Sequence, residues 1–431
     1  MSRTYRVPAI SSASLALCLT LTTGCGTSGP ADSASMQVWA LEDAAVNEIV
    51  EQGIDAHNES QEVPAELVTF VNDAYKQRLQ VALGSPNTPD VFFNWGGGNL
   101  AEYTSQGQVY DMTQDLDDNP EFRDAFLPSV LDVARIDGSY YGVPLLGVQP
   151  VVMYYNKPVL DSAGLEPPET YDDLLEAVET LKEQGTTPIT LPGAQGWTQL
   201  MWFSYLVDRI GGPEVFQAIA DQEEGSWNDP AVVQALEMCQ ELVELGAFGP
   251  NFSSIDYDNG SASALLATGE SAMFLMGSWD LAQQMENNPE FVENDELGYT
   301  SFPVLEEGAG EPNAIVGNPS NFFSINETST HTDAAVDFLV ETMASDEYVD
   351  ELIDAGQVPA VEGIEEELQQ SDHAAFAAFT HQLVSQAPTF TQSWDQALPP
   401  AEAEAMLTNL QLVFLEDLTP EEFAQEMEEL R

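Results

Sequence analysis

Three tryptophans lie where a strand or loop meets a helix, a position from which an aromatic ring can contact a ligand. Trp95 precedes three glycines, Trp279 follows an apolar run, and Trp394 lies in a polar segment. An aromatic face stacks on the C–H groups of a sugar ring, while nearby amides and carboxylates bind its hydroxyl groups. The pattern therefore favours a carbohydrate-binding site. Trp39 and Trp202 fall inside strand and helix patterns, so we expect them in the core.

Sequence signatures of catalysis and of metal binding are missing. The chain contains no His-Glu-x-x-His, no Gly-x-Ser-x-Gly and no Walker loop, and its four histidines lack metal-ligand spacing. Asp258, in a segment whose glycine lies one position too early for a calcium loop, is interpreted as a helix cap. A glycosidase needs two positioned carboxylates, but no pair stands out among 73 acidic residues. We expect no enzymatic activity, no metal and no cofactor, and keep a secreted glycoside-active enzyme as an alternative.

Two further motifs have structural interpretations. The triple glycine Gly96-Gly97-Gly98 stands between a strand and a helix, where backbone N–H groups can hold an anion. No lysine follows, so we expect these glycines to let a ligand approach the backbone closely. Cys239 lies alone in a helical pattern, and a buried thiol is favoured over a nucleophile.

The charge of the chain excludes one class of partner. The formal net charge is -63, from 73 acidic and 10 basic residues. No basic patch can be assembled to meet phosphates, so nucleic-acid binding is excluded. Such acidity indicates a surface adapted to high salt, where screening weakens self-repulsion. A disordered acidic chain is rejected, because apolar and aromatic residues are abundant and regularly spaced.

The first residues have the pattern of a bacterial lipoprotein export signal. Arg3 and Arg6 precede an apolar run over 9–21, too short to span a bilayer, and Gly24 precedes Cys25. We expect a signal peptide over 1–24, lipidation of Cys25 and a small, polar tether over 25–35. The alternative is an ordinary cleaved secretory signal. Either signal predicts a protein outside the cytoplasmic membrane.

Short β-like runs alternate with amphipathic helices, which predicts an α/β protein. Asp137-Gly138 is a typical hairpin turn. About 400 residues follow the signal, more than one core usually holds, so two lobes are expected. The opening βαβαβ unit is predicted from strands at 36–40, 65–71 and 89–93 and helices at 43–57 and 74–83.

Three segments then resemble the family 1 extracellular solute-binding proteins, which deliver sugars to ABC importers. They are Tyr140–Pro144, Met153–Lys157 and Ala267–Trp279. The resemblance implies a two-lobed, type II periplasmic-binding-protein-like fold with the ligand cleft between the lobes. The implied N-terminal lobe comprises 36–147 and 319–360, and the C-terminal lobe comprises 148–318 and 361–431.

The resemblance also implies which side chains contact the ligand. Gln149 lies on the first crossing between the lobes, where maltodextrin-binding relatives carry a carboxylate, so maltose is disfavoured. The second crossing is expected near Gly317–Asn321, with Ser320 or Asn321 facing the cleft. The full set of expected ligand contacts is Glu42, Asp43, Asn94, Trp95, Gln149, Trp197, Gln199, Trp279, Asp280, Asn321, Trp394 and Asp395.

The function implied is capture of a sugar or oligosaccharide by lobe closure, without covalent chemistry. Segments around Trp95 and Trp394 look similar to actinobacterial binders of plant-polysaccharide fragments such as xylobiose. The implied partners are an ABC permease and, through the lipid anchor, the extracellular face of the cytoplasmic membrane, with the protein as a monomer. Two alternatives stay open: a peptide or polyamine cargo, and a sensor subunit that presents bound sugar to a receptor.

Overall fold

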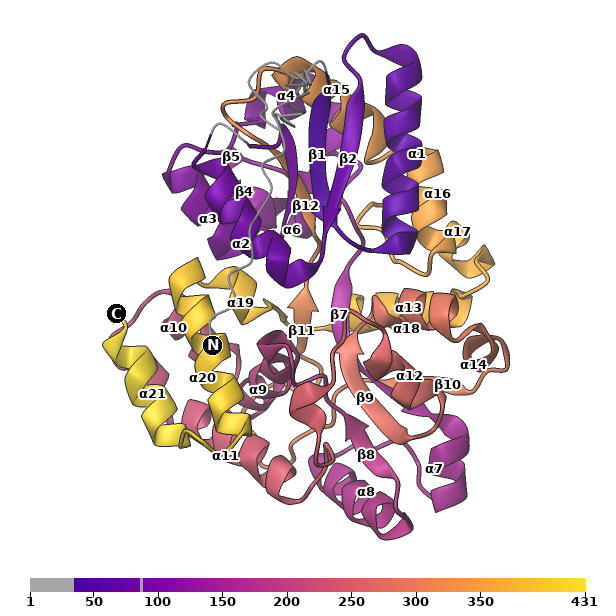
Figure 1. Ribbon diagram of the computed structural model, residues 1–431, viewed down its shortest axis with the longest axis vertical. Helices are drawn as coiled ribbons and strands as arrows, with labels where there is room; N and C mark the ends of the chain where they lie inside the picture. Colours follow the sequence, from indigo (N-terminus) through magenta and orange to yellow (C-terminus); the bar gives the residue numbers. More distant parts are fainter. Residues whose placement is uncertain (1–34, 86–87) are drawn as a thin grey trace, which may run out of the picture.

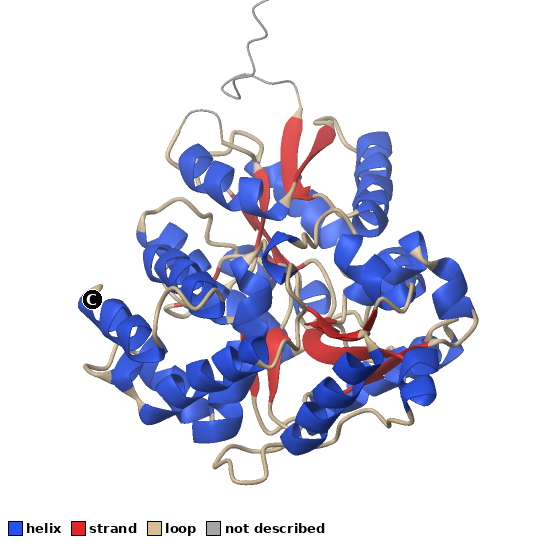
Figure 2. Cartoon of the chain, turned by 60° about the horizontal axis from the view of Figure 1, so that its bottom comes forward, coloured by secondary structure: helices blue, strands red, loops and turns tan. Residues whose placement is uncertain are grey.

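The computed structural model describes residues 35–85 and 88–431, and these residues form two large β-sheets, each with its own hydrophobic cluster. Figure 1 shows one sheet in the upper half of the molecule and the other in the lower half, and we call these halves the upper and lower lobes. Helices surround both sheets (Figure 2). This two-lobed α/β architecture confirms the expected fold class.

The upper sheet begins with the predicted βαβαβ unit. Strand β1 pairs in parallel with β2 on one side and with β3 on the other. Strand β12 returns late in the chain and pairs antiparallel with β3. The strand order is β2 (Ala65–Phe70), β1 (Met36–Leu41), β3 (Val91–Asn94), β12 (Phe322–Ile325) and β6 (Val143–Pro144).

The helices of the upper lobe contribute buried apolar side chains to the upper cluster. They are α1 (Ala44–Ser60), α2 (Asn72–Leu83), α3 (Gly97–Ser105), α4 (Thr113–Asp118), α5 (Pro120–Arg123), α6 (Pro128–Leu131), α15 (Thr332–Thr342), α16 (Asp346–Asp354) and α17 (Glu365–Gln370). The predicted hairpin is confirmed: β4 (Arg135–Ile136) pairs antiparallel with β5 (Ser139–Tyr140), and both turn residues have positive φ.

The lower sheet is centred on β7, which is buried over almost its whole length. The strand order is β13 (Phe390–Gln392), β11 (Ile315–Asn318), β7 (Gln149–Asn156), β9 (Ser271–Gly277) and β8 (Thr187–Thr190), with β10 (Leu297–Thr300) paired to β7. Its helices are α7 (Lys157–Ala163), α8 (Tyr171–Gln184), α9 (Gly196–Gly211), α10 (Pro213–Ala220), α11 (Pro230–Glu244), α12 (Ser261–Ala267), α13 (Asp280–Asn287), α14 (Pro289–Glu293), α18 (Ala374–Gln386), α19 (Trp394–Ala397), α20 (Pro400–Phe414) and α21 (Pro420–Glu429).

The described chain passes between the lobes three times, the third time between α17 and α18, and the first two crossing segments are neighbours. Leu146 and Val148 pack in the upper cluster and lead directly into β7, while β11 leads through Asn318–Asn321 into β12. These segments pack closely, because a Cβ on Gly317 would lie 2.3 Å from the Gln149 carbonyl oxygen. Gly317 also has a φ of +148°, which few other residues adopt. The expected lobe boundaries remain predictions. Leu368 of α17, which they assign to the C-terminal lobe, packs in the upper cluster.

Core predictions made from periodicity are confirmed for Trp202 and Cys239, whereas Trp39 is only half-buried and packs against the upper cluster without belonging to it. Trp202 and Cys239 lie fully inside the lower cluster, and burial raises the pKa of the Cys239 thiol. Within the described ranges, no helix combines the length and apolar character that a bilayer span requires. Cys25 and the expected signal lie outside the described residues.

Candidate functional site

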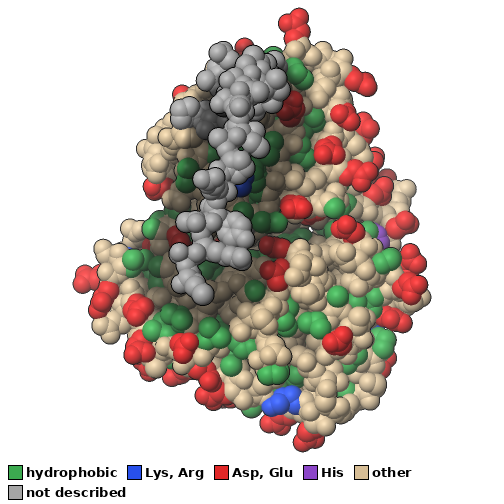
Figure 3. Space-filling view, viewed as in Figure 1, with side chains coloured by type: hydrophobic (Ala, Val, Ile, Leu, Met, Phe, Trp, Pro, Cys, Tyr) green, Lys and Arg blue, Asp and Glu red, His purple; other side chains and the backbone are tan. Residues whose placement is uncertain are grey.

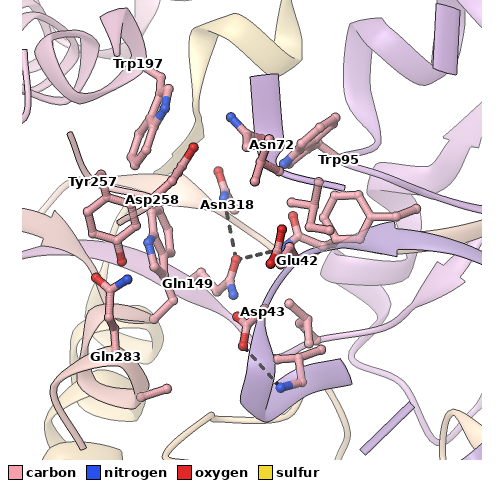
Figure 4. Close-up of a pocket in the computed structure, with 18 of the residues that line it drawn as sticks. Glu42, Asp43, Asn72, Trp95, Gln149, Trp197, Tyr257, Asp258, Gln283 and Asn318 are labelled. Carbon is pink, nitrogen blue, oxygen red and sulfur yellow. Dashed lines mark hydrogen bonds between the residues drawn. The ribbon is translucent and has the colours of Figure 1, made fainter. Parts of the chain in front are cut away.

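A cavity of about 460 Å³ lies between the lobes and is lined by residues of both. The upper lobe contributes the β1–α1 junction, the start of α2 and the loop after β3. The lower lobe contributes the first turns of α9, the loop before α12, and α13. Figure 4 shows the amides of Gln149 and Asn318 in the middle of this cavity, between aromatic side chains on two sides.

Aromatic rings form one wall on the lower lobe. The ring centroid of Trp197 lies 5.3 Å from that of Tyr257, edge to face, and 6.3 Å from that of Trp279. All three residues line the cavity. The indole Nε1 of Trp197 is buried with no hydrogen-bond partner in the described chain. This wall therefore offers apolar faces and one unused donor.

Trp95 lies on the opposite, upper side of the cavity (Figure 4). Its ring packs edge to face on Phe93 and Tyr75, and only 7% of the residue is exposed. Nζ of Lys76 lies 4.8 Å from the ring centroid and covers part of one face. Trp95 is thus held rigidly, with a small part of its surface turned to the cavity.

Polar side chains from the first two crossing segments line the back of the cavity. Oε1 of Gln149 accepts a hydrogen bond from Nδ2 of Asn318 at 3.5 Å (Figure 4) and one from Nδ2 of Asn321 at 2.9 Å. All three side chains are buried. Oδ1 of Asn321 and Oγ of Ser204 line the same cavity and have no partner among the described residues. Buried polar atoms are normally paired, so these two are available to hydroxyl groups of a ligand.

Carboxylates from both lobes stand around the same cavity. Asp43 caps α1, since its Oδ1 accepts the backbone N–H of Val46 at 3.2 Å. Burial raises the pKa of Asp43, and the charge of Glu286 on α13 raises it further. Glu42 and Asp258 line the cavity as well. The lining is therefore acidic on both sides.

Lys76 is the one basic side chain among the cavity-lining residues that the structure describes. Its Nζ donates to Oδ2 of Asp395 at 2.8 Å, so its charge is balanced within the protein. Asp395 belongs to α19 of the lower lobe, and this ion pair joins the two lobes.

The cavity brings together eight of the twelve expected ligand contacts. Each of these residues contributes to its lining, although no ligand is present to test a contact. They are Glu42, Asp43, Trp95, Gln149, Trp197, Trp279, Asn321 and Asp395.

Trp394 is placed elsewhere, and its predicted stacking role is corrected. The residue is 1% exposed, and its ring stacks on Phe216 at 4.6 Å and meets Phe203 edge to face. The polar neighbours of Trp394 suggested an exposed loop. The short helix α19 instead turns the indole into the lower core and leaves Asp395 at the cavity.

Three polar residues of the expected set also have structural positions outside the cavity lining. Asn94 shapes the turn before α3, because its Nδ2 donates to Ser324 and its Oδ1 accepts the N–H of Gly96. Gln199 is 1% exposed within α9. Asp280 is fully buried, and burial raises its pKa to about 6 while Ser263 and Gln284 hydrogen-bond to its carboxylate.

The expected role of the triple glycine is also corrected. A Cβ on Gly98 would lie 2.2 Å from the carbonyl oxygen of Ala397, and one on Gly97 would lie 2.4 Å from Gln392. These glycines therefore let the lower lobe's own chain approach α3. A ligand at that backbone would collide with α19.

Several lining residues were missed by the sequence reasoning: Asn72, Lys76, Tyr257, Asp258, Gln283, Glu286 and Asn318. Asp258 was noticed as a helix cap, but α12 begins after Gly260 and has no side-chain cap, so that role is wrong. Asn318 lies in the predicted second crossing, whereas Oγ of Ser320 donates to the Leu146 carbonyl and ties the crossings together. No sequence pattern marked the remaining residues as ligand contacts, because they are ordinary polar residues that only the fold brings to the cavity.

Comparisons with known proteins agree with this architecture. A family model for bacterial extracellular solute-binding proteins matches residues 42–350. The diacetylchitobiose binding protein of Streptomyces coelicolor is 28% identical over 307 residues, which cover 70% of this chain and 68% of that protein. A solved structure reported in work on xylan utilization by Caldanaerobius polysaccharolyticus aligns with a TM-score of 0.81 and 25% identity, covering 92% of this chain and 99% of that one.

A third relative is an ABC transporter extracellular-binding protein of Pyrococcus horikoshii. It is 30% identical over 211 residues, 47% of this chain and 45% of that protein. The match to a second Pyrococcus horikoshii protein likewise covers 50% of its length. The chain thus spans about half the length of these two relatives.

Proposed function

This chain belongs to the bacterial extracellular solute-binding proteins, and we propose that it captures a sugar or short oligosaccharide for an ABC importer. One observation carries the proposal: one interlobe cavity combines an aromatic wall with a buried hydroxyl oxygen and a buried amide oxygen that have no partner among the residues described. Stacking faces and unused hydrogen-bonding groups together match the surface of a sugar ring.

The polar groups supply orientation. Ser204 offers a hydroxyl and Asn321 offers an amide oxygen, and each is buried where water is displaced when a ligand binds. Leaving a buried polar atom unpaired costs about 1–3 kcal/mol, so a ligand hydroxyl placed against either atom recovers that energy. An apolar molecule of the same size would leave both atoms unpaired.

Capture proceeds by rotation of the lobes about the first two crossing segments. Gln149 and Asn321 belong to different crossings and are hydrogen-bonded to each other, so they stay together while the lobes move. The aromatic wall on the lower lobe and Trp95 on the upper lobe then approach the ligand from opposite sides. Binding to both lobes favours the closed state, and a permease recognises that state. The ligand is held without cleavage of a bond.

A disaccharide or short oligosaccharide is the cargo that fits this cavity. Its volume of about 460 Å³ lies within the range of about 300–1,000 Å³ for small-ligand sites. A xylobiose-like fragment is favoured by the similarity to the structure from the xylan-utilization work, and diacetylchitobiose by the Streptomyces coelicolor relative.

The protein acts as a monomer anchored through a lipid on Cys25 at the extracellular face of the cytoplasmic membrane. The support is the lipoprotein-like signal before a small, polar tether in the sequence.

Calorimetric titration tests the proposal. The protein used is the chain from residue 26 onward, which contains every described strand and helix of both lobes. It is titrated with xylo-, cello-, malto- and chito-oligosaccharides, spermidine and a peptide mixture. We expect saturable binding of one sugar series and no change in its chromatographic profile after incubation. Binding of spermidine or peptide alone would replace the cargo class, and release of shorter sugars would establish an enzyme.

A further inference from the structure

The side chains that line the cavity include several carboxylates and few basic groups. Glu42 and Asp43 come from the β1–α1 junction of the upper lobe, and Asp258 and Glu286 come from the lower lobe. A ligand between the lobes therefore has carboxylates on both sides of it. Figure 3 shows acidic side chains spread over both halves of the visible face, with few basic ones.

Asp43 of the upper lobe and Glu286 on α13 of the lower lobe both line this cavity. The charge of Glu286 raises the pKa of Asp43 in addition to the larger effect of burial, so the two carboxylates interact. Closure of the lobes keeps these like charges close. An anion placed between them would add to the repulsion instead of relieving it.

Three groups that could bind an anion are already paired within the protein. Lys76 is neutralised by Asp395 at 2.8 Å. The first residues of α1 line the cavity, and the carboxylate of Asp43 caps the N-terminus of this helix. At α3, the N–H of Gly96 is bonded to Oδ1 of Asn94.

We propose that this cleft rejects anionic saccharides, and that Glu42, Asp43 and Glu286 are the residues that discriminate. The inference rests on the proposed function, since it concerns the same cavity and the same sugar cargo. The amides and aromatic rings bind the neutral part of any sugar, while the carboxylates around them act against a uronic acid, a sialic acid or a sugar phosphate. The transported class is therefore uncharged or amino-bearing saccharides.

The test compares each acid with a neutral molecule of the same size. The probes are xylotriose carrying one glucuronic acid branch, cellobiouronic acid, and the methyl esters of both, alongside unmodified xylotriose and cellobiose. For the chain from residue 26 onward, we expect the acid to bind at least about tenfold more weakly than its ester at low salt. The difference should shrink in molar salt, where the Debye length is about 3 Å.

Two variants locate the effect in the cleft. Glu42→Gln and Glu286→Gln change exposed side chains. Each should reduce the ratio of ester affinity to acid affinity by about threefold. Glu290→Gln removes the same charge from exposed α14, outside the cavity lining, and should leave the difference unchanged. Asp43 is left intact because it caps α1.

Each outcome has one meaning. Equal affinities for acid and ester, or tighter binding of the acid, overturn the inference and leave sugar capture standing. An equal effect of Glu290→Gln overturns the assignment to the cleft, because the general charge of the protein then accounts for the discrimination. A protein that binds no neutral sugar of any series overturns the proposed function and this inference together.

Discussion

Nζ of Lys76 lies 2.8 Å from Oδ2 of Asp395, and this ion pair joins α2 of the upper lobe to α19 of the lower lobe. The side chain of Asp395 is 3% exposed. Nearby, Asn99 donates to the Asp395 carbonyl and Nε2 of Gln392 donates to the Trp95 carbonyl. The lobes are thus linked by polar contacts at this edge of the cavity, whereas Asp43 and Glu286 bring like charges from the two lobes to the same cavity lining.

Removing this ion pair should weaken sugar binding. The ion pair forms only when the lobes meet. In Lys76→Met, closure buries the carboxylate of Asp395 without this partner, so the closed state loses stability relative to the open state. We expect a loss of affinity of about 3- to 10-fold, corresponding to about 1 kcal/mol. Calorimetry measures the affinity, and small-angle scattering measures the fraction of closed molecules without ligand.

A matched control is available within the lower lobe. Lys157 pairs with the exposed Asp295 at 2.6 Å, and both belong to the same lobe. Lys157→Met should therefore leave sugar affinity unchanged. If both variants weaken binding equally, the interlobe position of Lys76 has no particular importance for closure.

Trp279 is expected to carry stacking energy. Trp279→Ala removes an aromatic face from the lower wall of the cavity and should weaken binding by about 1–3 kcal/mol. Trp39→Ala is the control, because Trp39 is half-buried in the upper lobe and does not line this cavity. Unchanged affinity in a folded Trp279→Ala protein would remove Trp279 from the site.

Trp394 should affect stability instead of binding. Its ring lies among Phe203, Phe216 and Trp227 in the lower core. Trp394→Ala leaves a cavity there and should lower the free energy of unfolding by about 3–5 kcal/mol, measured by urea denaturation. Loss of sugar affinity with undiminished stability would restore the stacking role that the sequence suggested.

High salt is expected to stabilise the folded chain. With a net charge of -63, like charges repel more strongly in the compact state than in the expanded one. Raising sodium chloride from 0.1 to 1 M shortens the Debye length from about 10 to about 3 Å and weakens that repulsion. The midpoint of thermal unfolding should rise, as followed by circular dichroism. A midpoint that falls with salt would contradict adaptation to high salt.

The sequence predicted the elements better than the direction of individual side chains. Hydrophobic periodicity identified the βαβαβ unit, because strands and helices each repeat their apolar positions at a fixed spacing. It did not reveal that Trp394 points inward and Asp395 toward the cavity, since a four-residue helix has no periodicity to read. The link between Lys76 and Asp395 joins residues 319 positions apart, and only the packing of the lobes brings them together.

Sequence position was more informative at the crossings. Gln149 and Asn321 were both expected at the cleft from the family resemblance, and they are hydrogen-bonded at the back of the cavity. Asp280 was also among the expected ligand contacts. Asp280 directly follows Trp279 in the sequence but lies in different surroundings, because the start of α13 turns its carboxyl group toward Ser263 and Gln284.

Asp280 should make stability depend on pH between about 4 and 6. Burial raises its pKa from 3.8 to about 6, so between these values the folded state holds a proton that the unfolded state has lost. The contribution of this group is therefore complete below pH 3.8, falls as the pH rises to 6, and is constant above it. Asp280→Asn does not titrate, so its free energy of unfolding relative to the native protein should rise by about 2–3 kcal/mol from pH 4 to 6.5, measured by urea denaturation.

Asp173→Asn is the control of opposite sign, because hydrogen bonds from Thr170 lower the pKa of exposed Asp173 and its contribution is lost as the pH falls. A difference between native protein and Asp280→Asn that does not change with pH would show that Asp280 keeps an ordinary pKa.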